Sequence, residues 1–266
     1  MKYEDIILEK REDLAVITLN RPEVLNALSR NLYREVDEAV TECESDPLVK
    51  AIIFTGSGDR AFSAGADIHE NARLAEEEAA HGSDINFSSK TKDAREDSSP
   101  RRSWHIGACT KPTIGAINGL AYGGAAIMSS SFDIRVGCER SSFRFLAATY
   151  GRVNSTWSLP MQVGWPKAKE LLFTGRVVEA DEAYRIGLLN HLVPSDQLMD
   201  KALEIGKLIA GNDPRMVQGI KELLIQDIGG SWERMYDNEI EAQSGKLRPT
   251  PVLEAFQGFL ERKGRK

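Results

Sequence analysis

The apolar run VKAIIFTGSG, residues 49–58, limits the fold more than any other segment. A strand that is apolar along its whole length is typical of a sheet covered on both faces, and such sheets are built from parallel strands. Two short β-rich segments, 3–9 and 13–19, precede it around a predicted hairpin turn. Residues 29–43 show helical spacing, with Ser29 as the predicted N-cap. The order strand, helix, strand predicts a right-handed crossover unit.

The alternation of strands and helices continues to about residue 195. Predicted strands PTIGAING and FDIRVGC flank the small-residue helix GGAAIMSSS, and the chain from Lys167 onwards is predicted to be mainly helical. We therefore expect a β/α core over residues 1–195 and a helical region over 196–266. The polar segment 71–103 interrupts this pattern: its start can form a helix, and the serine-rich remainder is expected to be a surface loop, either over a site or simply solvated.

Composition excludes several classes of protein. A chain of 266 residues with 41% hydrophobic and 28% charged residues is typical of a globular protein, and its net charge of −6 argues against general nucleic-acid binding. The first residues show no apolar signal segment, and no apolar run approaches membrane-spanning length. The three cysteines are scattered without metal-ligand spacing, as expected for buried thiols in a reducing compartment. We expect a cytoplasmic protein without metal, membrane or nucleic-acid partners.

Two turns of small residues carry the predicted chemistry. SAGADI, residues 63–68, follows the strand AIIFTG, and NGLAYGGAA, residues 118–126, lies between a strand and a helix. The N–H groups of Ala66 and Gly124 would then stand at helix starts, where a developing negative charge is stabilised. Each turn alone has a simpler explanation, because glycine also permits close packing of a strand against a helix. Together they predict two donors on one oxygen, such as that of a thioester carbonyl.

Four segments, in order, resemble the successive signatures of the crotonase (enoyl-CoA hydratase/isomerase) superfamily. They are RPEVLNALS, then AIIFTGSGDRAFSAGADIHE, then KPTIGAINGLAYGGA with FDIRVG, then ELLFTGRVVEADEAYRIGLLNHLVP. The resemblance extends from residue 3 to the C-terminal EAFQGFLERKG. It implies an α/β fold of the ClpP/crotonase-like type, a spiral of β-β-α repeats with a C-terminal helical region for trimerisation. It further implies an acyl-CoA substrate, no cofactor other than this CoA, and a homotrimer or a dimer of trimers.

The resemblance also assigns roles to individual residues. Ala66 and Gly124 match the two donors of an oxyanion hole, the pair of N–H groups that binds the carbonyl oxygen. Substrate-binding positions in the two turns and the preceding loop are Val24, Leu25, Ala27, Ala64, Asp67, Ile68 and Gly123. Phe259 and Lys263 match positions that complete the CoA site, often from a neighbouring subunit.

The chain departs from the family pattern where proton transfer takes place. Ile127 and Ala147 occupy the positions of the two glutamates that serve typical hydratases, and neither side chain can transfer a proton. The segment 151–158 replaces a proline- and glycine-rich stretch beside the acyl group. Asp133 matches a structural aspartate. Polar residues near the predicted site, none of them a clear replacement base, are His69, Glu70, His81, His105, Tyr122, Tyr150, Arg152, Asn154 and Ser155.

Two hypotheses follow from the sequence. The first is an enzyme that acts on a CoA thioester through oxyanion stabilisation, catalysing hydrolysis, decarboxylation or hydration of an unusual acyl group. Hydration of simple enoyl-CoA is expected to be very weak, because both usual carboxylates are absent. The alternative is a non-catalytic acyl-CoA-binding protein with the crotonase fold.

Overall fold

The computed structural model describes residues 3–80 and 103–263 of the chain. It divides into two compact units, Met1–Gly211 and Asn212–Lys266, and each is described here by itself. The first unit extends beyond residue 195, where the sequence suggested that a C-terminal helical region begins. The reason is helix α9 (Leu198–Ala210), which packs on the central strands of the first unit through Leu198, Ala202 and Ile205.

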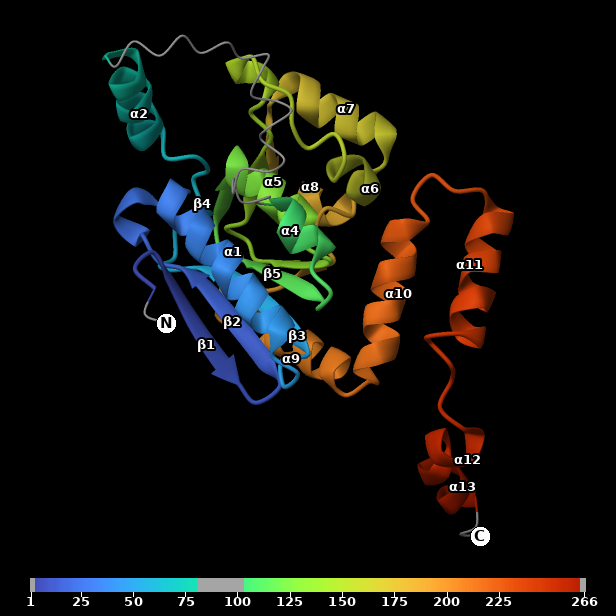
Figure 1. Ribbon diagram of the computed structural model, residues 1–266. Coiled ribbons are helices and arrows are strands. Elements are labelled where there is room, and N and C mark those ends of the chain that lie inside the picture. The colour runs from blue at the N-terminus through green and yellow to red at the C-terminus, as the bar shows by residue number, and fades with distance from the viewer. Residues whose placement is uncertain (1–2, 81–102, 264–266) are drawn as a thin grey trace. The chain divides into compact units, whose positions relative to one another are not determined.

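A six-stranded sheet forms one layer of the first unit (Figure 1). Its spatial order is β1 (Ile6–Arg11), β2 (Leu14–Leu19), β3 (Ala51–Gly56), β5 (Thr113–Ile117), β7 (Ile134–Gly137) and β10 (His191–Leu192). The predicted hairpin is confirmed by the antiparallel pairing of β1 with β2. The pairs β2–β3, β3–β5, β5–β7 and β7–β10 are parallel. Every residue of β3 is buried, as its sequence predicts for a sheet covered on both faces.

Helix α1 (Arg30–Ser45) connects β2 to β3 and confirms the predicted strand–helix–strand order. It begins where the sequence indicates, because the Ser29 hydroxyl accepts a hydrogen bond from the N–H of Leu32 (3.0 Å). Leu32, Val36 and Ala39 lie on its buried face, as their helical spacing predicts.

A second, four-stranded sheet has the order β4 (Ala61–Ser63), β6 (Leu120–Tyr122), β8 (Ser142–Arg144) and β9 (Val177–Glu179). The strands β4, β6 and β8 follow β3, β5 and β7 after short connections, so each turn of the chain adds one strand to each sheet. Phe132 joins the layers, since its ring lies 4.9 Å from that of Phe54 on β3 and 6.0 Å from that of Phe62 on β4, between ring centroids.

Helices cover the sheets, and the regular secondary structure described in the second unit is helical. In the first unit these are η1 (Pro22–Val24), α2 (Ile68–Ala80), α4 (Ser103–Ala108), α5 (Gly124–Ser131), η2 (Ala148–Tyr150), α6 (Leu159–Val163), α7 (Trp165–Thr174), α8 (Ala180–Arg185) and η3 (Ser195–Gln197). The second unit contains α10 (Pro214–Gln226), α11 (Trp232–Ser244), α12 (Val252–Ala255) and α13 (Gln257–Lys263). Within the described ranges, no helix combines the length and apolar character needed to cross a membrane.

The polar segment 71–103 is described only at its ends. Its start forms most of α2, in agreement with the helix suggested there, and its last residue, Ser103, begins α4. The rest of the expected surface loop, including His81, lies outside the described residues.

A buried arginine on the large sheet donates hydrogen bonds to the backbone at the end of α5 and to other segments. Arg135 on β7 is 1% exposed, and its guanidinium donates to the carbonyl oxygens of Phe132 (2.5 Å) and Leu188 (2.5 Å) and to the side-chain amide oxygen of Gln162 (2.6 Å). Burial lowers the pKa of Arg135 to about 10, against the opposing charge of Asp133, so the side chain stays protonated at neutral pH. The positive charge is therefore stabilised by carbonyl dipoles.

We expect Arg135→Met to lower the free energy of unfolding by about 3 kcal/mol or more, because it leaves buried carbonyl groups without donors. Urea denaturation monitored by circular dichroism measures the loss. Arg140→Met is the matched control, since Arg140 is exposed in the turn after β7, and it is expected to change stability by about 0.5 kcal/mol or less. Equal unfolding midpoints for the two variants would contradict the structural role of Arg135.

Candidate functional site

The loop 21–28 is held against the second sheet by Asn26, which is fully buried. Its side-chain oxygen accepts from the N–H of Arg21 (3.0 Å), and its amide nitrogen donates to the carbonyls of Ser57 (3.0 Å) and Ala61 (3.1 Å). Asn26 and Leu25 both have φ of 54°, a left-handed conformation that asparagine tolerates better than most residues. The RPEVLNALS segment thus forms a tight loop that directs its backbone toward the first small-residue turn.

The first small-residue turn pairs with this loop on both sides of Ala66. The N–H of Leu28 donates to the carbonyl of Gly65 (2.7 Å), and the N–H of Asp67 donates to the carbonyl of Leu28 (3.2 Å). In such a parallel bridge the N–H groups of successive residues point in opposite directions. The N–H of Ala66 therefore points away from the loop. It makes no hydrogen bond with the part of the chain that the structure describes, and Ala66 is exposed.

The second turn presents a similar donor at the start of α5. Gly123 has φ of 52° and donates its N–H to the carbonyl of Arg144 on β8 (2.8 Å). Gly124 is the first residue of the helix, so its N–H has no partner within the helix. Among the described residues it also has no other hydrogen-bond acceptor.

The two turns pack directly against each other, backbone to backbone. Gly65 has φ of 92°, and a Cβ atom there would overlap the carbonyl oxygen of Tyr122 and lie 3.0 Å from the nitrogen of Gly124. A Cβ atom on Gly124 would lie 3.5 Å from the nitrogen of Ala66. The structure therefore places Ala66 and Gly124 as neighbours, although they are 58 positions apart in the sequence. Their use as a pair of donors to one ligand oxygen stays a prediction.

Asp67 secures the start of α2 beside the first turn. Its carboxylate accepts from the N–H of Glu70 (3.1 Å) and from the guanidinium of Arg21 (3.0 Å), which also donates to the carbonyl of Ala27 (2.8 Å). Partial burial raises the pKa of Asp67, but the hydrogen bond from Glu70 and the charge of Arg21 outweigh it and hold the pKa below its ordinary value. Asp67 is thus a charged N-cap that links α2 to the loop 21–28.

The other predicted binding positions fall into two groups. Five line the loop and the first turn, where Val24 and Ile68 are exposed, Leu25 and Ala64 are joined by a backbone hydrogen bond (2.9 Å), and Ala27 is buried. Phe259 is exposed on α13 of the second unit. Lys263 ends the same helix, and its side chain lies outside the described residues. Their predicted part in a CoA site stays a prediction.

Ile127 and Ala147 both follow the second turn in the sequence. Ile127 is half-buried in the first turn of α5, where its N–H donates to the carbonyl of Gly123 (3.2 Å). Ala147 is buried just before η2, and its carbonyl accepts from the N–H groups of Tyr150 (3.1 Å) and Arg152 (2.8 Å). Both positions therefore place apolar side chains where the resemblance expected carboxylates.

His105 is held by two carboxylates of α1. Its Nδ1 lies 2.5 Å from Asp37 and its Nε2 lies 3.1 Å from Glu44, which also accepts from the N–H of Thr110 (2.7 Å). Partial burial lowers the pKa of His105, but the hydrogen bonds with Asp37 and Glu44 outweigh it and raise the pKa above the ordinary value of 6.5. His105 therefore links α4 to α1, and these contacts with Asp37 and Glu44 are called the His105 clamp.

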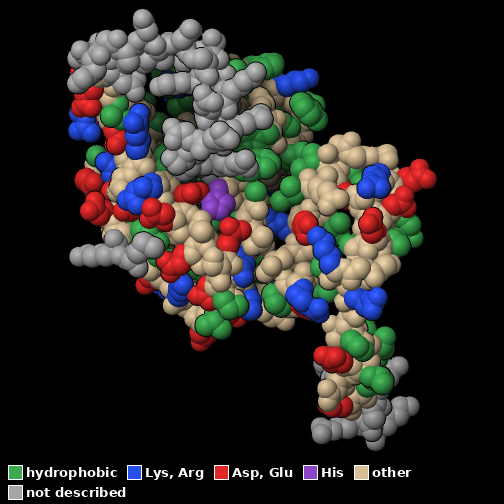
Figure 2. Space-filling model, viewed as in Figure 1, with side chains coloured by type: hydrophobic (Ala, Val, Ile, Leu, Met, Phe, Trp, Pro, Cys, Tyr) green, Lys and Arg blue, Asp and Glu red, His purple; other side chains and the backbone are tan. Residues whose placement is uncertain are grey.

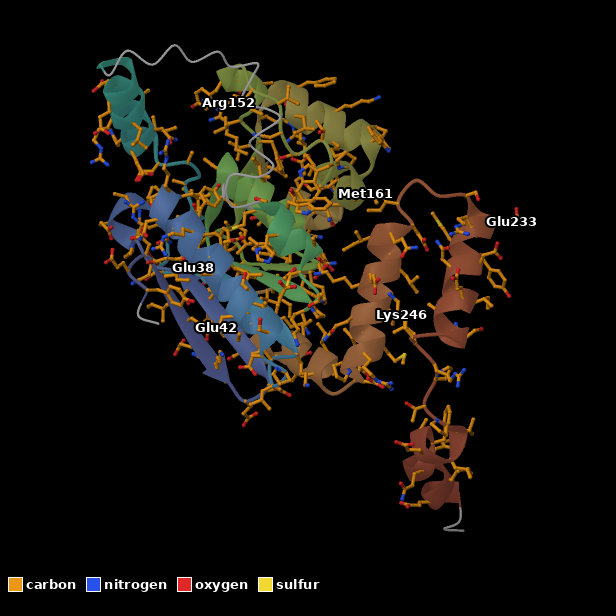
Figure 3. All side chains as sticks on the ribbon, in the orientation of Figure 1. Glu38, Glu42, Arg152, Met161, Glu233 and Lys246 are labelled. Atoms are coloured by element: carbon orange, nitrogen blue, oxygen red, sulfur yellow. The ribbon has the colours of Figure 1, made fainter. Side chains whose placement is uncertain are left out.

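The remaining polar candidates are dispersed. Glu70 accepts from the N–H of Arg30 (2.8 Å) at the start of α1, and Tyr122 is a hydrogen-bond partner of Ser142 (3.4 Å). Ser155 donates to Asn154 (3.3 Å) in the loop before α6. His69, Tyr150 and Arg152 are exposed, and Figure 3 shows Arg152 in the loop before α6. No three His, Cys, Asp or Glu side chains within the described residues could together hold a metal ion.

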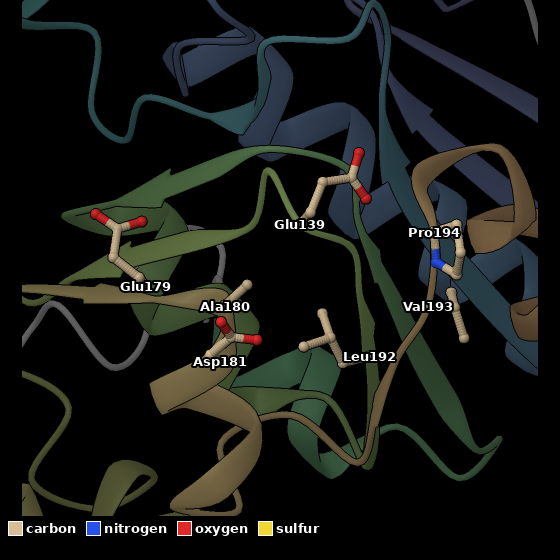
Figure 4. Close-up of a pocket in the computed structure, with 7 residues that line it drawn as sticks. All are labelled: Glu139, Glu179, Ala180, Asp181, Leu192, Val193 and Pro194. Atoms are coloured by element: carbon tan, nitrogen blue, oxygen red, sulfur yellow. The ribbon is translucent and has the colours of Figure 1, made fainter.

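A separate pocket of about 420 Å³ lies between the turn after β7, the start of α8 and the segment after β10 (Figure 4). Its lining residues are Glu139, Glu179, Ala180, Asp181, Leu192, Val193 and Pro194. None of the predicted site residues lines it. On the face that Figure 2 shows, acidic and basic side chains are intermixed over α1 and the β1–β2 hairpin.

Three residues beside the two turns were not predicted from the sequence: Tyr33, Arg21 and Asn26. Tyr33 lies within the predicted helix 29–43 and has no local signal of a site, yet a Cβ atom on Gly124 would lie 2.9 Å from its hydroxyl. Arg21 and Asn26 belong to the RPEVLNALS segment, where a buried asparagine in a loop is a signal of backbone hydrogen bonding.

Comparison with known proteins identifies relatives along nearly the whole chain. Residues 9–266 match the family model described as enoyl-CoA hydratase/isomerase. The crotonyl-CoA hydratase of Syntrophomonas wolfei is 34% identical, and the alignment covers 99% of this chain and 97% of the relative. The short-chain-enoyl-CoA hydratase of Clostridium acetobutylicum is 33% identical, with the same coverage of 99% and 97%.

Solved structures agree with this assignment. The enoyl-CoA hydratase from Bacillus anthracis superposes with a TM-score of 0.84 at 30% identity, covering 97% of each chain. An enoyl-CoA hydratase subunit from Geobacillus kaustophilus gives a TM-score of 0.83 at 28% identity, covering 98% of this chain and 97% of its own. Together with the two sheets described above, these structures confirm the expected α/β crotonase fold with a C-terminal helical region.

We expect the His105 clamp to make stability depend on pH. Because the folded-state pKa is raised, its contribution is fully present below pH 6.5 and is lost as pH rises through the folded value. The urea midpoint of wild type should therefore fall between about pH 6 and pH 8, relative to that of His105→Gln. The exposed His69→Gln control should keep the wild-type profile. A constant difference between wild type and His105→Gln at all pH values would contradict the clamp.

The two left-handed glycines of the site should differ in their tolerance of alanine. A Cβ atom at Gly123 would have no other atom within 4 Å. Gly123→Ala should therefore lower the free energy of unfolding only by the backbone strain of a positive φ, about 1–3 kcal/mol. Gly65→Ala carries comparable strain and also overlaps the backbone of Tyr122, so it should destabilise the protein more. Thermal unfolding of both variants measures the difference, and an equal cost would show that the two turns do not pack as described.

Proposed function

The chain belongs to the enoyl-CoA hydratase/isomerase (crotonase) family, and on that premise we propose that it is an enzyme that acts on an acyl-CoA thioester. The observation that carries the proposal is the direct packing of the two glycine turns. It leaves the N–H groups of Ala66 and Gly124 adjacent, with no acceptor among the described residues, beside an exposed surface. Two such donors suit a carbonyl oxygen that gains negative charge.

In the proposed mechanism the thioester oxygen accepts hydrogen bonds from both N–H groups. Electrons that move toward this oxygen, as an enolate or a tetrahedral intermediate forms, strengthen both hydrogen bonds. The donors are fixed in advance by the parallel bridge at Ala66 and by the start of α5, so little reorganisation is needed during the reaction. One donor of this kind typically lowers the barrier by about 3 kcal/mol.

We further propose that the CoA moiety lies along the loop 21–28 and the first turn. Val24 and Ile68 offer exposed apolar side chains there. Phe259 and Lys263 would complete the site from a neighbouring subunit of a homotrimer or dimer of trimers. No cofactor beyond the CoA of the substrate, and no nucleic-acid or membrane partner, belongs to this proposal, which places the enzyme in the cytoplasm.

The reaction class is constrained by the apolar side chains of Ile127 and Ala147. Hydration needs groups that deliver and remove protons, and these two positions supply none. Decarboxylation of an acyl-CoA demands less of a base, because loss of CO₂ leaves its electron pair on the α-carbon and forms the enolate directly. Thioester hydrolysis, C–C hydrolysis and hydration of an unusual acyl group are the other reactions within the proposal.

The same two positions favour the alternative function, a non-catalytic protein that binds acyl-CoA. A panel of acyl-CoA thioesters distinguishes the two functions when hydration, free-thiol release and CO₂ formation are followed separately with the purified protein. Turnover of any member supports the enzyme. Binding of the panel without turnover supports the alternative, and failure to bind any CoA thioester overturns both.

We expect wild type to hydrate crotonyl-CoA very weakly, since both proton-transfer positions are apolar. The double variant Ile127→Glu/Ala147→Glu should raise the rate at least about tenfold, because it supplies two carboxylates. Ile127→Gln/Ala147→Gln is the matched control, with side chains of the same size that transfer no protons at neutral pH. The loss of the ultraviolet absorbance of the conjugated enoyl thioester monitors the reaction, because hydration removes the C=C bond. Wild-type turnover equal to that of a typical hydratase would contradict this prediction.

A further inference from the structure

The hydroxyl of Tyr33 borders the same small space as the two N–H donors. A Cβ atom on Gly124 would lie 2.9 Å from this hydroxyl and 3.5 Å from the nitrogen of Ala66, so it would occupy the space between them. Tyr33 belongs to α1 rather than to either turn, and its side chain is 9% exposed. A third element of the fold thus brings a polar group to the place where the turns meet.

We infer that the Tyr33 hydroxyl is a third hydrogen-bond donor to the thioester oxygen, an inference that rests on the proposed function. An oxygen that gains negative charge can accept more than two hydrogen bonds, and an O–H donor to such an oxygen forms a strong, charge-assisted bond. The phenol rotates about its C–O bond and can orient its hydrogen toward the bound oxygen. No proton leaves Tyr33 in this role, so the charge stays on the substrate.

The position of the hydroxyl is set by the start of α1. The N–H of Tyr33 donates to the carbonyl of Ser29 (3.1 Å), in the first turn after the N-cap. Leu28, adjacent to that cap, pairs with Ala66 in the parallel bridge. A single stretch, 28–33, therefore positions both the first N–H donor and the phenol. The position of the phenol is therefore linked to that of the first N–H donor.

The inference also gives a reason for glycine at 124. A side chain there would stand within 3.0 Å of the Tyr33 hydroxyl and would displace it. Tyr33→Phe keeps the aromatic ring and its packing in α1 and removes only the hydroxyl. Removal of the single hydroxyl therefore separates the catalytic role from the packing role.

The test compares Tyr33→Phe with Tyr3→Phe. The control removes a hydroxyl that contacts Glu42, near the other end of α1 (3.2 Å). The probe is 4-(dimethylamino)cinnamoyl-CoA, whose absorption moves to longer wavelength when its carbonyl is polarised by hydrogen bonds. Wild type and Tyr3→Phe should produce the full shift. Tyr33→Phe should bind the probe with similar affinity and produce a smaller shift.

Turnover provides a second measurement, with whichever acyl-CoA of the panel wild type converts. Tyr33→Phe should lower kcat by about tenfold to a hundredfold and change KM little, because the hydrogen bond strengthens only as charge develops. If Tyr33→Phe unfolds at assay temperature, the spectral shifts of all three proteins are compared at a temperature below its unfolding midpoint. A smaller shift in Tyr33→Phe under that condition supports the inference.

The outcomes separate the inference from the proposed function. Equal spectral shifts and equal kcat in wild type and Tyr33→Phe overturn the third donor, while binding of the probe still supports acyl-CoA recognition. A reduced shift in Tyr3→Phe as large as that in Tyr33→Phe also overturns it, because the effect would then come from α1 as a whole. Failure of wild type to bind the probe or any panel member overturns the proposed function, and the third donor with it.

Discussion

The close contact between two glycine-containing turns is the constraint on which the rest of the site depends. Gly65 can lie against the carbonyl of Tyr122 only because it has no side chain, and its φ of 92° suits glycine alone. The contact requires β4 and β6 to be neighbours, which the spiral of two sheets provides. Asn118 reinforces this arrangement, since its side chain exchanges hydrogen bonds with Gly56 (3.1 and 2.8 Å) at the end of β3.

The sequence predicted most of the large sheet because its strands carry local signals. The fully buried β3 and the Ser29 cap of α1 were found from residue types and spacing alone. The strand β8 lies within the strand-like segment SSFRFLA, but β4 and β6 could not be read in this way, because each contains three residues, too few for any periodic pattern. These strands exist because neighbours distant in the sequence supply their hydrogen bonds. Only the family resemblance, through its β-β-α repeats, anticipated them.

In the candidate site, too, some residues are recognised from the local sequence and others only from tertiary packing. Ala66 and Gly124 were singled out because small residues before a helix mark a backbone donor. Tyr33 carries no such mark, since its spacing with Val36 and Val40 already explains it as part of a buried helical face. Its place beside Gly124 follows from tertiary packing. The extent of the first unit was likewise decided by packing, because the sequence of α9 does not show that its apolar face covers the large sheet.

The donors at this site and the groups that transfer protons depend on the sequence in different ways. Backbone N–H groups are fixed by the fold, so a change of side chain at positions such as 127 or 147 leaves them in place. Proton transfer depends on individual side chains and is lost with a single substitution. Under the proposed function, such a scaffold keeps its ability to stabilise a charged oxygen while the reaction changes. As the proposed third donor, Tyr33 would strengthen that ability without supplying proton transfer, and the proposal therefore favours chemistry in which the enolate forms without a strong base.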